Sequence, residues 1–184
     1  SGIDKYNKAQ KNRVDKLNTI KIDTSGSNLN VLKHWINDHG TGDSIGGLAL
    51  LTVAFDPPYF DTIPQGTPEA GKHILFQWGS EYNHQVTIVG YNDSIRYDFN
   101  HDGHYTNNID INGDGKVNML DWEIGAFKLA NSWGVSFEDS GYVYLPYKLF
   151  ADNYNFQNTV GVMTVKTIDK PDIIMNVKLS HPCR

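Results

Sequence analysis

The apolar positions along the chain fall at two spacings, one typical of a helix and one typical of strands. Residues 29–38, "LNVLKHWIND", repeat their apolar side chains every three or four positions, so they predict a helix that ends before Gly40. Shorter runs rich in Val, Ile and aromatic residues, bounded by Gly, Pro and Asn, predict strands. These runs cover residues 17–23, 46–56, 72–79, 84–92, 126–133, 141–147 and 159–168.

This pattern predicts an α+β fold, with a closed or nearly closed β-sheet and one helix packed against it. Residues 57–71 are rich in Pro and Gly and are expected to form a loop. We assign residues 1–168 to one domain. After Pro171 the apolar pattern restarts, so residues 169–184 are interpreted as the truncated start of a following β module or as a linker.

Composition excludes two classes of partner. The chain has 184 residues and a formal net charge of −5, and its lysines and arginines form no extended basic patch, so nucleic acid is not expected as a partner. No apolar run approaches the roughly 18 residues of a membrane-spanning helix, and a membrane partner is not expected either. The single cysteine, Cys183, excludes an internal disulfide.

The segment "DINGDGKVNMLD", residues 110–121, has the spacing of a twelve-residue calcium loop. Calcium takes six to eight oxygen ligands, and alternate residues of such a loop direct oxygens to one centre, with a glycine at the sharp turn. Gly115 stands at the turn position. The expected ligands are Asp110, Asn112, Asp114, the backbone carbonyl of Lys116, Asn118 and Asp121.

The preceding segment resembles a second, less complete loop. Oxygen ligands are expected from Asp98, Asn100, Asp102 and a backbone carbonyl at His104, but the twelfth position is Ile109, which has no side-chain oxygen. Paired loops of this kind resemble the dockerin modules that bind scaffold proteins. Because the two loops begin only twelve residues apart, no helix fits between them, and a calcium-clamped insertion over residues 94–125 is favoured over a docking module.

The sequence on either side of this insertion resembles the papain-like cysteine peptidases. Three motifs appear in the family's order: a histidine that begins a strand running into V-G-Y, an N-S-W-G turn, and a G-Y strand. They are His84 with residues 89–91, residues 131–134, and residues 141–142. The resemblance covers about residues 15–165 and implies mainly the antiparallel β-barrel half of that fold.

The resemblance also implies roles for particular residues. His84 matches the histidine that takes the proton of a catalytic thiol, and Asn131 matches the asparagine that orients it. Trp133 would cover the hydrogen bond between them. Leu48 and Gln85 fall near the family's second substrate subsite.

A papain-like enzyme needs a nucleophilic cysteine at the start of a helix, and Cys183, which follows a proline near the chain end, does not fit that position. The expected partners are therefore an upstream peptidase half that carries the cysteine, as a missing segment or separate chain, and a peptide substrate. The resulting hypothesis is the C-terminal part of a secreted, bacterial cysteine endopeptidase with bound Ca²⁺. The alternative is a non-catalytic, dockerin-like calcium-binding module on a peptidase-like scaffold.

Overall fold

The computed structural model describes residues 5, 8–9, 12–40, 42, 45–56, 58–152 and 159–167. Residues 168–184, which include Cys183 and the expected following module, lie outside the described residues. The chain divides into two units, one formed by Leu17–Met163 and the other by Ser1–Lys16 together with Thr164–Arg184. The second unit contains, among its described residues, the outer ends of the first and last strands. The site discussed below lies entirely within Leu17–Met163.

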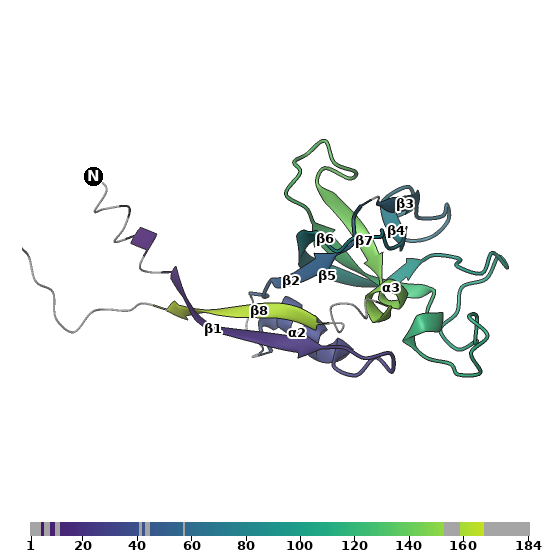
Figure 1. Ribbon diagram of the computed structural model, residues 1–184, viewed down its shortest axis with the longest axis horizontal. Helices are drawn as coiled ribbons and strands as arrows, with labels where there is room; N and C mark the ends of the chain where they lie inside the picture. Colours follow the sequence, from purple (N-terminus) through teal and green to yellow (C-terminus); the bar gives the residue numbers. More distant parts are fainter. Residues whose placement is uncertain are drawn as a thin grey trace, which may run out of the picture. The chain divides into compact units, whose positions relative to one another are not determined.

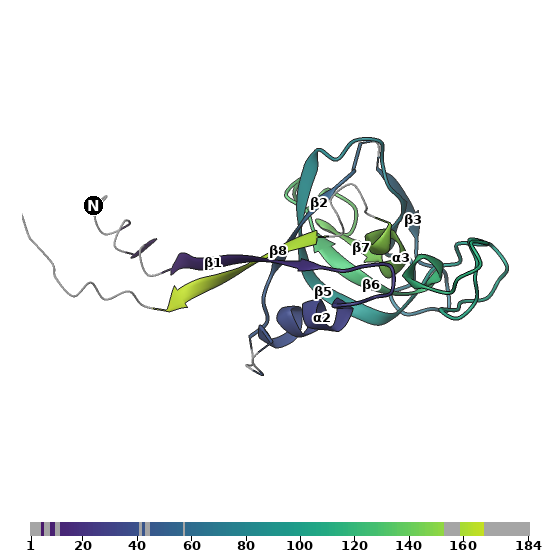
Figure 2. The same ribbon diagram turned by 60° about the horizontal axis from the view of Figure 1, so that its bottom comes forward.

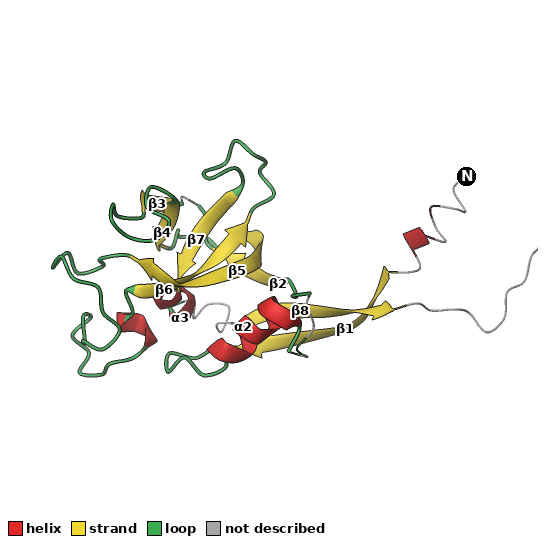
Figure 3. Ribbon diagram, turned by 180° about the vertical axis from the view of Figure 1, so that it is seen from behind, coloured by secondary structure: helices red, strands yellow, loops and turns green. Residues whose placement is uncertain are grey.

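One mixed sheet of eight strands forms the framework, in the order β1-β8-β2-β5-β6-β7-β4-β3 (Figure 1). The strands are β1 (Asn12–Lys21), β2 (Ala49–Val53), β3 (Tyr59–Thr62), β4 (His73–Gln77), β5 (His84–Arg96), β6 (Ile124–Ala130), β7 (Tyr142–Pro146) and β8 (Thr159–Thr167). Two α-helices, α2 (Leu29–Asp38) and α3 (Tyr147–Ala151), and the 3₁₀ helix η1 (Met119–Asp121) complete it (Figure 3). The α+β class is confirmed.

The antiparallel barrel that the resemblance implied needs one correction, because the sheet is mixed: β4 pairs with β7 in parallel, at Ile74 and Tyr144. The reason lies in the connection from β4 to β5, which does not make a hairpin. Instead Gly79 donates to the carbonyl oxygen of Ala54 at 2.7 Å, which fastens this connection to the end of β2. Apolar runs predict where strands lie but not which strand is the neighbour.

Helix α2 confirms the helical spacing read from the sequence. Leu29, Leu32 and Ile36 are buried on one face, and Trp35 packs partly against the core. The helix ends at His39, whose left-handed backbone (φ 56°) lets its N–H donate to the carbonyl of Trp35. Burial of this face, at about 1.5–3 kcal/mol for each large side chain, holds α2 on the sheet.

Alternation along the strands produces two core clusters, one on each face of the sheet. Leu75 of β4 and Phe127 of β6 join the larger cluster, which includes both α-helices, whereas their neighbours Ile74 and Ala126 join the smaller one. Successive side chains of a strand point to opposite faces, so this division follows from the period of two.

Strands β5 and β6 form a long antiparallel pair that carries the insertion at one end (Figure 2). The pair extends beyond the predicted boundary at residue 94: Ile95 is buried, and Arg96 still pairs with Ile124. The insertion therefore consists of residues 97–123 instead of 94–125. The insertion is fastened to the domain core. Met119 is fully buried in the larger cluster, and its N–H donates to the carbonyl of Thr24 at 2.7 Å.

Candidate functional site

His84 and Asn131 lie beside each other at the end of the β5–β6 pair that is remote from the insertion. His84 begins β5 and Asn131 follows β6 directly, and the register that pairs Thr87 with Ala130 brings both to one edge. The distance between His84 Nε2 and Asn131 Oδ1 is 2.8 Å. Because an amide oxygen can only accept, Nε2 carries the hydrogen and Nδ1 keeps its lone pair in the neutral ring.

Aromatic rings enclose this hydrogen-bonded pair. The imidazole of His84 packs against Trp133, at 4.6 Å between ring centroids, and against Phe55, at 6.0 Å, and these two rings also meet at 6.2 Å. Phe55 is buried, Trp133 is half exposed, and Phe137 meets Trp133 edge to face at 5.1 Å. Rings in this position limit the access of water to the His84–Asn131 hydrogen bond, which strengthens it.

The turn after β6 depends on two glycines with left-handed backbones. Gly134 has φ 91° and Gly141 has φ 94°, and a Cβ atom on Gly141 would lie 3.4 Å from the carbonyl oxygen of Gly134. The two ends of the turn meet where Asn131 donates from its backbone to Gly141 at 2.9 Å. The glycines of the two sequence motifs therefore set the path of the loop that carries Trp133.

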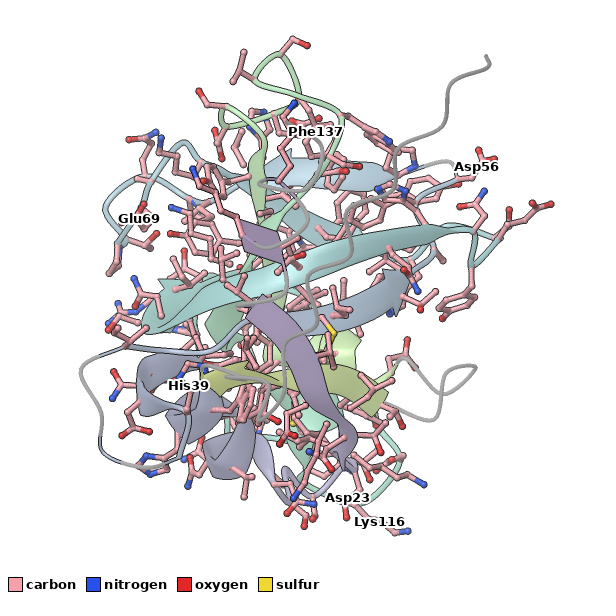
Figure 4. All side chains as sticks on the ribbon, turned by 90° about the vertical axis from the view of Figure 1, so that its left-hand side faces the viewer. Asp23, His39, Asp56, Glu69, Lys116 and Phe137 are labelled. Carbon is pink, nitrogen blue, oxygen red and sulfur yellow. The ribbon has the colours of Figure 1, made fainter. Side chains whose placement is uncertain are left out.

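A shallow groove of about 350 Å³ opens beside the histidine, and it is lined by Phe55, Asp56, Asn83, His84 and Trp133. In Figure 4, Asp56 and Phe137 mark this end of the larger unit, and Asp23 and Lys116 lie at the opposite end. Asn131 Nδ2 is buried and has no hydrogen-bond partner within the described part of the chain. The site therefore offers an oriented imidazole and a buried amide donor that an added acceptor can satisfy.

The two residues expected in a substrate subsite, Leu48 and Gln85, are not among the residues that line this groove. Gln85 is exposed and follows His84 directly, so its side chain points to the other face of β5. Leu48 is 60% exposed but precedes β2, whose opposite end, at Val53, pairs with His84. The structure does not bring Leu48 to the groove.

In the insertion, residues 110–121 fold as a tight loop around their carboxylates. Asp110 accepts from the backbone of Gly113 and Gly115, both at 2.8 Å, and Asp114 accepts from Lys116 at 2.8 Å. The carboxylate of Asp121 is fully buried. It accepts from the backbone amides of Ile111, Asn112 and Asn118 at 3.1, 3.2 and 2.9 Å.

The first loop repeats this hydrogen-bond pattern at the matching positions. Asp98 accepts from Gly103 at 2.8 Å, as Asp110 does from Gly115. Asp102 accepts from the backbone of His104 at 2.7 Å, and this hydrogen bond, together with one from the Asn100 side chain, lowers the pKa of Asp102. The less complete sequence thus adopts the same local fold.

Sequence reasoning missed Glu123, which fills the place that Ile109 leaves open. Glu123 is 3% exposed, and its two carboxylate oxygens accept from Phe99 at 3.0 Å and from Thr106 at 3.1 Å. These are the second and ninth positions of the first loop, the same positions that Asp121 contacts in the second. Burial raises the pKa of Glu123, although its amide hydrogen bonds act in the opposite direction.

The sequence signal that could have pointed to Glu123 is its position as a lone acidic residue within the otherwise apolar run "WEIGAF". Among the described residues, Asp121 and Glu123 are the two buried charged side chains, one for each loop. Within this same part of the chain, no three His, Cys, Asp or Glu side chains form a metal-binding group. The donor set consists of oxygens alone, which fits calcium chemically.

No model of a known protein family matches the chain, and no curated protein sequence shows significant similarity to it. Within the described segments, no helix has both the length and the apolar character needed to cross a membrane.

Proposed function

We propose that this chain supplies the histidine and asparagine of a papain-like cysteine endopeptidase that acts outside the cell. The observation that carries the proposal is the 2.8 Å contact from His84 Nε2 to Asn131 Oδ1, covered by Trp133 and open on one side to a groove. The order of the motifs along the sequence supports the same assignment. The substrate class is peptide or protein, and the thiol would come from an upstream segment or a partner chain.

The chemistry follows from the tautomer that Asn131 selects. With the hydrogen on Nε2 held by the amide oxygen, Nδ1 can accept the proton of an incoming thiol. The resulting thiolate attacks the carbonyl carbon of the peptide, and the imidazolium protonates the leaving amine nitrogen as the C–N bond breaks, which leaves a thioester. Water, deprotonated by the same imidazole, then attacks the thioester, so the carboxylic acid leaves and the thiol is restored. Asn131 keeps the ring oriented in both steps, and Trp133 shields that hydrogen bond.

We further propose that the insertion binds calcium and serves as a structural clamp. Asp110, Asn112, Asp114, Asn118 and Asp121 would hold one ion, with the carbonyl of Lys116. Asp98, Asn100, Asp102 and Glu123 would hold a second, with the carbonyl of His104. The ion would give the two buried carboxylates, Asp121 and Glu123, a cation to face, which favours the folded insertion.

The test of the catalytic proposal is covalent labelling of the purified protein with a peptidyl epoxide that alkylates papain-like nucleophiles. Denatured mass spectrometry should find a second polypeptide, or an upstream segment, that gains one inhibitor mass. His84→Ala should abolish this labelling and the peptidase activity of the assembled protein without changing calcium affinity. His34→Ala, on the exposed side of α2, is the matched control and should label normally. Full activity in His84→Ala would end the proposal.

The alternative function is a dockerin-like binding module. Its support is that the insertion lies at the end of the larger unit opposite the groove, as Lys116 and Asp56 show in Figure 4, so a scaffold protein could bind there without covering the groove. The 3₁₀ turn η1 is formed by the last three residues of the second loop, and β6 already begins at Ile124, so a helical docking face of the dockerin kind has little support. Catalysis therefore remains the favoured proposal.

A further inference from the structure

His73 lies between two carboxylates of the loop that carries Trp133. It begins β4, and its Nδ1 is 3.1 Å from Asp139 Oδ1 while its Nε2 is 3.1 Å from Glu138 Oε2. Its backbone N–H also donates to Asp139 Oδ2 at 2.7 Å. Residues separated by more than 60 positions thus form three contacts between β4 and the β6–β7 loop.

Only a protonated imidazole can make both side-chain contacts at once. In the imidazolium form both ring nitrogens are donors, whereas in the neutral form one nitrogen carries a lone pair that repels the carboxylate it faces. The side chains of Glu138 and Asp139 are 24% and 15% exposed, so water screens these interactions only in part. Loss of the proton therefore removes one of the two side-chain contacts.

The formal charges of the other ionisable side chains on the neighbouring elements sum to zero. The neighbouring elements contribute two cations, two anions and two phenols: Lys72, Lys128, Glu69, Asp61, Tyr142 and Tyr144. Burial raises the pKa of Tyr144 to about 12, so this phenol stays neutral near neutral pH. The carboxylates of Glu138 and Asp139 are the acidic groups in direct contact with the ring.

The loop needs to be held, because part of its backbone is strained. Glu138 and Ser140 have φ of 38° and 58°, in the left-handed region that side chains other than glycine rarely adopt. The same loop carries Trp133, which covers His84, and Phe137, which packs on Phe60 at 5.7 Å.

We infer that His73 is a positioning residue: its imidazolium holds Glu138 and Asp139, and through them the loop that keeps Trp133 over the His84–Asn131 hydrogen bond. Neutral His73 releases one anchor, so the loop opens more often once the ring has lost its proton. The consequence for peptide hydrolysis rests on the proposed function, but the loop motion does not.

The test is amide hydrogen exchange and NMR on the full chain between pH 5 and 9. The reporters are the Gly141 amide, which donates to Phe137 at 2.7 Å inside the loop, and the Trp133 indole, assigned by Trp133→Phe. In the wild-type protein the protection of Gly141, corrected for intrinsic exchange, should fall about three- to tenfold between pH 5 and 9, as expected for loss of one charged contact at a partly exposed site. The Trp133 indole signal should follow the same curve.

His73→Gln should show low protection at every pH and lose the pH dependence at Trp133. Glu138→Gln, a milder change in the loop itself, should give an intermediate effect and keeps the test valid if His73→Gln folds poorly. His34→Gln, on α2, should behave as wild type. An unchanged pH profile of Gly141 and Trp133 in both His73→Gln and Glu138→Gln would overturn the inference. Neither reporter depends on catalysis, so these measurements test the role of His73 even if the thiol-labelling experiment fails.

Discussion

Glu123→Gln tests whether the buried glutamate completes the first loop of the insertion. The carboxylate accepts one backbone hydrogen bond on each oxygen, from Phe99 at 3.0 Å and from Thr106 at 3.1 Å. Glutamine has the same size but a single acceptor oxygen, so one of the two amides would face an NH₂ group instead of an acceptor.

The magnitude follows from that lost contact. A hydrogen bond to a charged acceptor contributes about 1.5–3 kcal/mol, and part of this is offset because burial disfavours the ionised carboxylate and raises the pKa of Glu123. Without calcium, the unfolding free energy should fall by about 1–2 kcal/mol, or about 2–8 °C in Tm for a chain of this size. The affinity of the first loop for calcium should fall by at least about 100-fold, since the change removes a proposed ligand of the ion and not merely a residue that hydrogen-bonds to a ligand.

Isothermal titration with CaCl₂ into chelator-treated protein measures both stoichiometry and affinity. The wild type should bind two ions for each chain, and Glu123→Gln should retain one. Asp121→Asn is the matched control, because it alters the equivalent carboxylate of the other loop and should leave the first ion bound. Two ions of unchanged affinity in Glu123→Gln would refute the assignment of Glu123 to the first loop.

Three further outcomes are expected. EDTA should lower the Tm in scanning calorimetry, because an ion bound only by the folded chain stabilises it; an identical Tm would mean that the loops hold no ion. If the insertion is a docking module, Asp110→Ala with Asp114→Ala should abolish association with a scaffold partner in pull-down assays, whereas binding by calcium-free protein would contradict that function. Gly125→Ala should cost about 3 kcal/mol or more in urea unfolding, since its Cβ would lie 2.3 Å from the Tyr147 ring at a φ of 103°. Gly90→Ala, whose Cβ would approach Lys128 no closer than 3.9 Å, should cost far less, and equal losses would contradict the packing argument.

Much of the fold could be predicted from the spacing of apolar residues. The helix over 29–38 lies where the pattern placed it, and seven of the strands overlap their predicted runs, because burial on one face fixes that pattern. The strand β1 is the least accurate of these, since it begins at Asn12, five residues before the predicted run. The strand β3 was missed, since three of its four residues are exposed and it lies in a segment rich in Pro and Gly. The helix α3 was missed because its five residues are too few to show a helical period.

The candidate site was predictable in its residues but not in all of its contacts. His84 and Asn131 are 47 positions apart, and their pairing was expected from the order of motifs. The contacts of Glu123 with Phe99 and of His73 with Asp139 had no local signal, because they depend on how the chain returns after the insertion and after β6. Register and side-chain partners of this kind are set by tertiary packing.

The burial of Met119 makes the insertion a part of the domain that cannot simply be deleted. A shortened protein that joins Arg96 directly to Ile124 would lose a side chain that is fully enclosed in the larger core cluster, together with the backbone hydrogen bond to Thr24. Removal of a buried methionine costs about 2–5 kcal/mol, a large share of the stability of an ordinary domain. A natural or designed chain with this fold but a plain β5–β6 turn therefore has to refill that space with a side chain from elsewhere.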